Sequence, residues 1–153
     1  MHSRIYQIST EPIDEEEYFD ESDFYEHWFL GAIADYVSED TDRDEDITWL
    51  GRVNKEVFQI TDGKLQVISK EGYFEKSYEN FQELIEKMSD ITLKDFQTAK
   101  CDSAMWKLKN TYDDEFSFYM YSEDYGLETL DHFMRRVEDG DIYYIGGTLD
   151  YHY

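Results

Sequence analysis

Cysteine is almost absent from this chain, and its scarcity excludes two kinds of site. Cys101 is the only cysteine, so the chain has no internal disulfide and no paired thiolates to hold zinc. The neighbouring Asp102 disfavours the thiolate form of Cys101, which argues against a nucleophilic role. A chain without disulfides is typical of a reducing compartment.

Long apolar runs are absent as well. No stretch approaches the ~20 apolar residues that a membrane-spanning helix needs. The first ten residues also lack the apolar segment that follows the basic start of a signal peptide. We therefore expect a cytoplasmic protein, with no membrane among its partners.

The motifs of common enzymes are missing too: the chain has no Gly-x-Ser-x-Gly element and no glycine-rich phosphate-binding loop. Asp40, Asp42 and Asp44 begin like a calcium-binding loop. The pattern then fails, because Glu45 stands where that loop needs glycine and Gly51 where it needs glutamate. The four histidines lack metal-ligand spacing: His2, His27, His132 and His152. We expect no cofactor, no metal and no enzymatic activity.

Acidic residues are what the chain has in excess, and they are segregated along it. The net charge is −23, from 37 acidic and 14 basic residues. Residues 1–50 carry 16 acids and two arginines, residues 51–110 carry ten residues of each sign, and residues 111–153 carry 11 acids and two arginines. Such a field repels nucleic acid and attracts basic surfaces. We expect a basic protein as partner, and no direct contact with nucleic acid.

The composition is nevertheless that of a folded protein. Apolar residues make up 41% of the chain, which includes 14 tyrosines, 10 phenylalanines and three tryptophans. Disordered acidic chains lack such side chains. A chain of 153 residues is long enough to bury a real core, so we expect one acidic domain over residues 1–153.

Local patterns predict elements in the N-terminal half. Residues 4–8 alternate like a strand, and residues 22–37 carry apolar side chains at helical spacing behind a Ser22 cap. The six acids of residues 39–46 indicate a solvated loop.

The Asp62-Gly63 dipeptide is the strongest local signal, because a two-residue hairpin turn needs positive φ at both positions. Residues 57–61 and 64–68 flank it and alternate in polarity. Pairing outward from the turn places four apolar side chains on one face of a half-buried hairpin: Phe58, Ile60, Leu65 and Val67. A third strand is expected at residues 73–76.

Two further helices are predicted, at residues 77–88 and 127–138, with a Thr92–Asp95 capping box that begins a short helix between them. Each long helix carries an apolar stripe, and the two stripes match under a 49-residue shift: Phe81, Leu84, Ile85 and Met88 in one, Leu130, Phe133, Met134 and Val137 in the other. A repeated ββα unit is therefore one interpretation.

Strand-like alternation recurs at residues 104–109 and 116–121, and residues 142–151 read as a hairpin that turns at Gly146-Gly147. The expected fold class is α+β: an antiparallel sheet of hairpins with about three packed helices.

The amount of charge favours imitation of nucleic acid. One turn of duplex DNA holds roughly 20 charges over ~34 Å, and a compact chain of this length has a diameter near ~38 Å. The net charge of −23 is therefore comparable to that of one duplex turn, spread over a similar length. The leading hypothesis is an acidic inhibitor that occupies the basic site of a nuclease or another nucleic-acid-binding protein. It covers anti-restriction, anti-CRISPR and nuclease-immunity proteins. The alternatives are a regulatory or interaction domain whose acidity serves solubility, and an enzyme with an unrecognised site.

The candidate partner-binding residues are the clustered acids of three segments, and tyrosines exposed among them are candidate anchors. The acids are Asp14, Glu15, Glu16, Glu17, Asp20, Glu21, Asp23, Glu39, Asp40, Asp42, Asp44, Glu45, Asp46, Asp113, Asp114 and Glu115.

Overall fold

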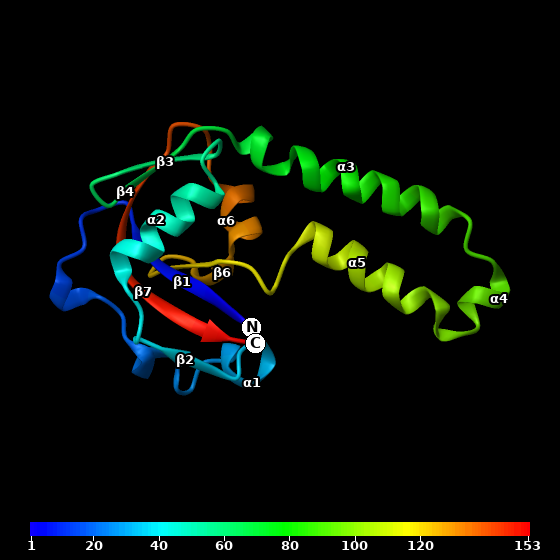
Figure 1. Cartoon of the computed structure of the whole chain (residues 1–153), viewed down its shortest axis with the longest axis horizontal. Helices are drawn as coiled ribbons and strands as arrows, with labels where there is room; N and C mark the ends of the chain where they lie inside the picture. The colour runs from blue at the N-terminus through cyan, green and yellow to red at the C-terminus, as the bar shows by residue number, and fades with distance from the viewer.

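The computed structural model describes residues 1–153 and shows a sheet with packed helices from which a long helical hairpin projects (Figure 1). We call residues 70–112 the arm and the remainder of the chain the body. The seven-stranded sheet has the order β3-β4-β7-β1-β5-β6, with β2 paired to β7. Only the β1–β5 pair is parallel. The strands are β1 (His2–Ser9), β2 (Tyr36–Ser38), β3 (Phe58–Thr61), β4 (Lys64–Val67), β5 (Tyr119–Ser122), β6 (Gly126–Thr129) and β7 (Ile142–His152).

Helices occur on both sides of the sheet and in the arm, so the fold class is α+β as predicted. The α-helices are α1 (Phe29–Ala32), α2 (Arg43–Val53), α3 (Lys70–Ser89), α4 (Leu93–Phe96), α5 (Asp102–Tyr112) and α6 (Leu130–Arg136). Three short 3-10 helices complete the structure: η1 (Glu15–Glu17), η2 (Glu21–Phe24) and η3 (Ala99–Cys101).

Both faces of the sheet bury a core. On one face, α2 and α6 contribute Leu50 and Phe133 to a cluster of 14 buried residues. On the other face, the segment between β1 and β2 contributes Phe24 and Phe29 to a cluster of nine. The two acidic ends of the chain meet in this sheet, because β1 pairs with β7 along most of its length.

The predicted hairpin is confirmed, including its register. Phe58 pairs with Val67 and Ile60 with Leu65, and the turn residues Asp62 and Gly63 have φ of 49° and 71°. Phe58, Leu65 and Val67 are buried and Ile60 is half-buried against the first core.

The helix predicted at residues 22–37 is wrong. Gly31 adopts φ of 83°, which ends the helix after a few residues, and the chain continues into β2 at Tyr36. Upstream, Asp20 rather than Ser22 is the N-cap, and it closes only the 3-10 turn η2. Of the apolar face predicted for this helix, Phe24 is buried but Trp28 is exposed.

The hairpin predicted at residues 142–151 is also wrong, because β7 runs through Gly146-Gly147 without turning. Opposite these glycines the register against β1 shifts: Tyr6 faces Thr148 but Ile8 faces Ile145, so two residues of β7 oppose Gln7 alone. This is a β-bulge. A side chain at Gly146 would place its Cβ 2.5 Å from Gln7 Oε1, so glycine fits the close approach.

The strands predicted at residues 73–76 and 104–109 are wrong, because both segments are helical. Ser69 caps α3 by accepting a hydrogen bond from Gly72 N (2.9 Å), so this helix begins well before Ser77. The predicted Thr92–Asp95 capping box of α4 is confirmed.

The arm buries none of its side chains. The burial predicted for the apolar stripe of the first long helix is wrong. Phe81, Leu84 and Met88 are half-buried against α5, and Ile85 is exposed. The corresponding stripe on α6 is buried. A helix does follow each of the hairpins β3–β4 and β5–β6, but α6 packs on the sheet while α3 leaves it.

Candidate functional site

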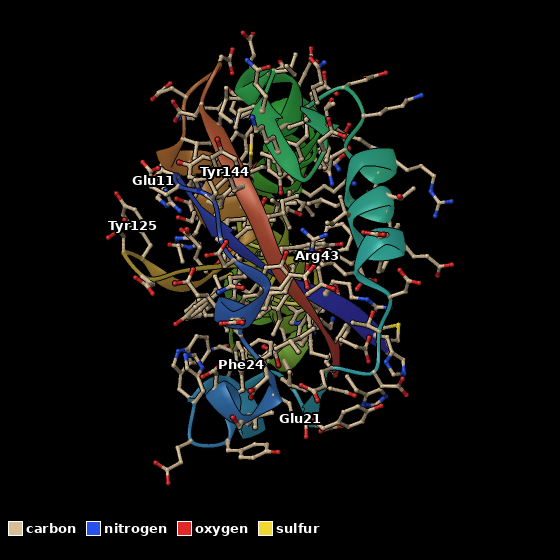
Figure 2. The ribbon with its side chains drawn as sticks, turned by 90° about the vertical axis from the view of Figure 1, so that its left-hand side faces the viewer. Glu11, Glu21, Phe24, Arg43, Tyr125 and Tyr144 are labelled. Carbon is tan, nitrogen blue, oxygen red and sulfur yellow. The ribbon has the colours of Figure 1, made fainter.

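The first acidic segment, residues 11–23, crosses the sheet on short 3-10 turns held by the buried Phe19 (Figure 2). The Phe19 ring stacks on Tyr121 with centroids 5.7 Å apart. Asp20 accepts hydrogen bonds from Ser22 N (2.7 Å) and Ser22 Oγ (2.5 Å), which hold the pKa of Asp20 below its ordinary value. The acids of this segment are exposed, except for the half-buried Glu21.

The second acidic segment, residues 39–45, leads into α2 rather than forming only a loop, which corrects the sequence expectation. Asp42 is the N-cap, and its Oδ1 accepts hydrogen bonds from Asp44 N and Glu45 N, both at 3.0 Å. Acids are favoured here because the first turn of a helix presents unpaired N–H groups and a positive dipole. The helix start thus explains why acids cluster at this point.

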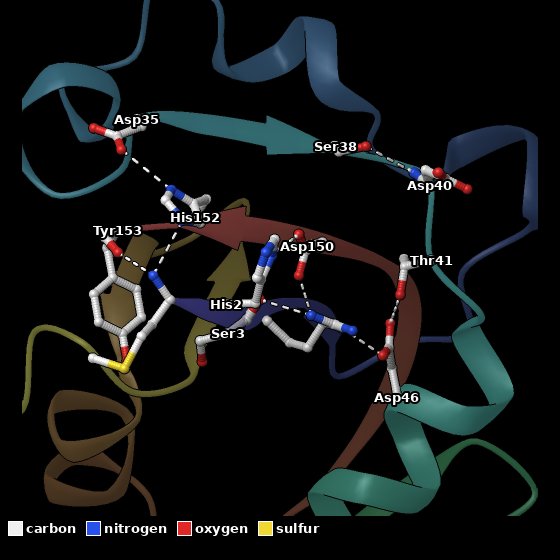
Figure 3. Close-up of polar contacts among 12 residues, drawn as sticks. His2, Ser3, Asp35, Ser38, Asp40, Thr41, Asp46, Asp150, His152 and Tyr153 are labelled. Carbon is white, nitrogen blue, oxygen red and sulfur yellow. Dashed lines mark hydrogen bonds and ion pairs between the residues drawn. The ribbon is translucent and has the colours of Figure 1, made fainter.

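Asp46, the next residue, is buried and is not available to a partner (Figure 3). Its Oδ1 accepts from Arg4 Nε at 2.6 Å, and its Oδ2 accepts from Thr41 Oγ1 (2.6 Å) and Thr148 Oγ1 (2.8 Å). Arg4 also pairs with Asp150. This carboxylate therefore fastens α2 to the sheet, and we remove it from the candidate site.

The β-bulge of β7 holds both acidic segments. Arg43 donates from Nε to Gly146 O (2.6 Å) and from its second terminal nitrogen to Ile145 O (2.7 Å), while its guanidinium lies 5.3 Å from the Tyr18 ring centre. A side chain on Gly147 would meet the Phe19 ring at 2.9 Å. The two segments are thus joined at the bulge by a cation over an aromatic ring.

Gln7, which faces the bulge, fixes the first segment by its amide. Gln7 Oε1 accepts from Gly147 N (2.9 Å) and Phe19 N (3.2 Å), and Nε2 donates to Glu17 O (2.9 Å). Gln7, Arg43 and the glycine pair, which position the acids, were not predicted from the sequence. A Gly-Gly pair inside a run of strand-forming residues is the signal that could have indicated a bulge.

Tyr25, which is 64% exposed, lies just after the first acidic segment. Its hydroxyl donates to Glu21 Oε1 at 2.9 Å. That hydrogen bond raises the pKa of Tyr25, and the charges of Asp20 and Glu39 raise it further. Trp28 is exposed nearby in the chain. An aromatic side chain with a polar tip therefore stands among the carboxylates.

We call the candidate partner-binding acids of both segments, which include neither Glu11 nor Asp46, the acidic face. It consists of twelve residues: Asp14, Glu15, Glu16, Glu17, Asp20, Glu21, Asp23, Glu39, Asp40, Asp42, Asp44 and Glu45. No ion pair involves the first segment, and the second has only Asp44 with Arg43, at 3.4 Å with the Asp44 side chain 93% exposed. The acidic face is therefore almost uncompensated.

The cations of the body are largely committed to other partners. Arg136 pairs with Glu128 at 2.5 Å and stacks over Tyr125 at 3.7 Å, and Arg135 stacks over Tyr112 at 3.9 Å. The body has a net charge of −22 and the arm −1, from 29 acids against seven basic residues and eight against seven. The negative field belongs to the body.

The third predicted cluster, Asp113 to Glu115, lies away from the acidic face, in the connection between α5 and β5 (Figure 1). Asp113 pairs with His132 at 3.1 Å and Glu115 with Lys109 at 2.7 Å. Asp114 is half-buried, and burial raises its pKa, as do the charges of Asp131 and Asp113. The structure does not bring these residues together with the other acids.

No group of three or more His, Cys, Asp or Glu side chains is arranged to hold a metal ion. A cavity of about 760 Å³ lies between β1 and the β5–β6 turn, and Arg136 is its one cation, already paired with Glu128. No helix has the length and apolarity to cross a membrane. The chain matches no family model, and comparisons with curated proteins and with solved structures also found no match.

Proposed function

We propose that this protein is an inhibitor that binds the basic nucleic-acid-binding surface of a nuclease, or of another nucleic-acid-binding protein, in place of nucleic acid. The acidic face carries this proposal: twelve carboxylates on two fastened segments, almost without ion pairs. Uncompensated charge of one sign is costly to concentrate, because it repels itself. A basic partner surface relieves that repulsion.

The positioning of the acids supports recognition rather than solubility alone. Arg43 and Gln7 tie the two segments to the bulge of β7, so the carboxylates keep a fixed spacing on the body. A preorganised charged surface loses less conformational entropy on binding than a flexible tail. Tyr25 supplies a large aromatic contact of the kind that dominates binding energy at interfaces.

The experiment is capture of partners from a bacterial lysate on the immobilised protein, followed by elution with duplex DNA or with salt. We expect a basic nucleic-acid-binding protein that is released by both eluents, since the acidic face and DNA compete for one surface. Partners that stay bound in excess DNA while remaining able to bind it would contradict the proposal. Their identity separates a restriction or CRISPR nuclease from a nuclease toxin.

The interaction-domain alternative is favoured by a different observation, the exposed apolar side chains of the arm. At its tip, Leu93 and Phe96 are 73% and 78% exposed. Exposed apolar groups of this size mark interaction surfaces.

A further inference from the structure

The arm is a two-helix hairpin with no core of its own. Helices α3 and α5 contact each other, yet none of the 43 residues from Lys70 to Tyr112 is buried. Most helical stability in proteins comes from packing an apolar face, and short helices without such packing are marginal in water. In a single chain, the two helices of the arm therefore bury too little apolar surface to be stable by their own packing.

One side of the arm is apolar across both helices. On α3, Phe74, Tyr78, Phe81 and Ile85 follow one another at spacings of four, three and four residues, the seam spacing of helical bundles. Tyr112 of α5 lies beside them, with its ring 6.4 Å from that of Phe81. We call this surface, together with Met105 one heptad before Tyr112, the arm seam.

The arm seam is open to solvent. Tyr78, Ile85, Met105 and Tyr112 are all exposed. A cavity of about 420 Å³ lies at its base, lined by Phe74, Tyr78, Phe81 and Tyr112 and by two cations, Lys70 and Arg135 of the body. On the opposite side of the hairpin, Trp106 lines one mostly polar cavity with residues such as Asn80 and Lys107, and a second cavity with Phe116 and Tyr153 of the body.

We propose that two copies of this chain pack arm seam against arm seam, with the arms antiparallel, as a four-helix bundle. This proposal is independent of the function proposed for the acidic face. Its first support is charge: the arm carries −1 and the body −22, so the arm is the part of the surface where two copies approach without strong repulsion. A basic partner is drawn to the body instead.

The antiparallel orientation follows from the same charges. It places the two bodies at opposite ends of the paired arms, separated by about the 30 Å length of a 20-residue helix, well beyond the ~8 Å screening length of physiological salt. The tip residues Leu93 and Phe96 of one copy reach the base of the other arm.

The contact area is that of a weak, reversible dimer. The 20 residues of α3 give a strip about 30 Å long and the 11 residues of α5 one of about 16 Å, each about 10 Å wide, so the face offers roughly 460 Å² per copy, or about 900 Å² in total. Stable interfaces begin at about 1,200 Å², so we expect the copies to exchange between monomer and dimer.

Sedimentation equilibrium over a range of concentrations tests the proposal. We expect the mass to approach twice the 18.4 kDa of one chain, and the helical circular dichroism signal to rise with concentration as arms pair. A single species of monomer mass up to about millimolar concentration, where weak specific contacts are populated, would overturn the proposal.

Two variants locate the contact. Tyr78→Glu with Ile85→Glu introduces charge into the arm seam and should weaken the dimer at least about 100-fold. Trp106→Glu is the matched control, an exposed aromatic of the same arm on the opposite side, and should leave the mass unchanged. Equal dissociation by both variants would exclude the arm seam as the interface. The near-ultraviolet circular dichroism spectrum of each full-length variant, to which the buried aromatic residues of the body contribute, shows whether the variant is folded.

Discussion

Asp46 shows how a single acid can have a different role from its neighbours. It is buried and accepts hydrogen bonds from Arg4, Thr41 and Thr148, whereas Asp44 two residues earlier is solvent-exposed. We expect Asp46→Ala to lower the free energy of unfolding by about 3–5 kcal/mol, because it removes one of the two carboxylates that pair with the half-buried Arg4 and the acceptor of two threonine hydroxyls. Urea denaturation measures this loss.

The control for this prediction is Asp44→Ala, which should change stability by less than about 0.5 kcal/mol. Similar small losses in both variants would show that the existing ion pair with Asp150 is enough to compensate Arg4. Sequence reasoning could not separate these two aspartates, because the partner that buries Asp46 lies 42 residues away in the chain.

Asp114 provides a pH-dependent prediction. Burial raises its pKa, so the folded state holds this proton more tightly than the unfolded state does. The group therefore destabilises the fold as pH rises through its folded pKa, which lies above the ordinary value near 4. We expect Asp114→Asn to be more stable than the parent at pH 7, while an amide oxygen can still accept from Phe116 N.

The advantage should shrink as the pH falls below the ordinary aspartate range, because the parent is then protonated in both states. Chemical denaturation of parent and variant at both pH values gives the comparison. A stability gain that is equal at neutral and acid pH would show that the charge of Asp114 is not its cause.

At the scale of elements, the bulge of β7 determines where the acidic face lies. A Cβ at Gly147 would meet the Phe19 ring at 2.9 Å and the Tyr18 Cβ at 3.2 Å. We expect Gly147→Ala to cost about 1–3 kcal/mol, as for overpacking, and to loosen the first acidic segment. Urea denaturation gives the first quantity, and amide hydrogen exchange of residues 11–23 gives the second.

Gly51→Ala in α2 is the matched control. Its Cβ would lie 3.4 Å from the flexible end of Ile60, and alanine is favoured over glycine within a helix. We expect it to be neutral or stabilising. If Gly147→Ala behaves in the same way, the close approach at the bulge does not constrain the segment.

The elements that sequence reasoning could predict are those with a local cause. The β3–β4 hairpin has its register fixed by Asp62-Gly63, and α4 has its own capping box. The wrong elements depend on distant contacts. Gly146-Gly147 looks like a turn until β1 lies beside it, and residues 104–109 alternate like a strand but form a helix against α3.

For the whole molecule, the charge pattern along the chain becomes a pattern in space. Pairing of β1 with β7 brings the two acidic ends into one body, and most of the neutral middle becomes the arm. The segregation of charge is visible in the sequence, but this division into body and arm is not. Asp113 to Glu115 were expected in the same field as the first two segments, whereas the fold puts them at the base of the arm.

The most direct test of the account is the association rate with a captured partner, measured for two charge-reversed variants. The first changes Glu15, Glu16, Asp40 and Glu45 to lysine. These acids of the acidic face make no side-chain hydrogen bond or ion pair, and the substitutions change the net charge by +8. The control makes the same charge change on exposed acids of α3: Glu75, Glu79, Glu83 and Glu86.

We predict that the association rate of the first variant is at least about tenfold lower than that of the parent, and that the rate of the control is close to the parent's. The difference in rate between the two variants should disappear as the salt concentration rises from about 50 to about 500 mM. Equal slowing by both variants would mean that net charge, and not the acidic face, drives the encounter. A partner that binds at an unchanged rate in both, and binds nucleic acid at the same time, would contradict the account.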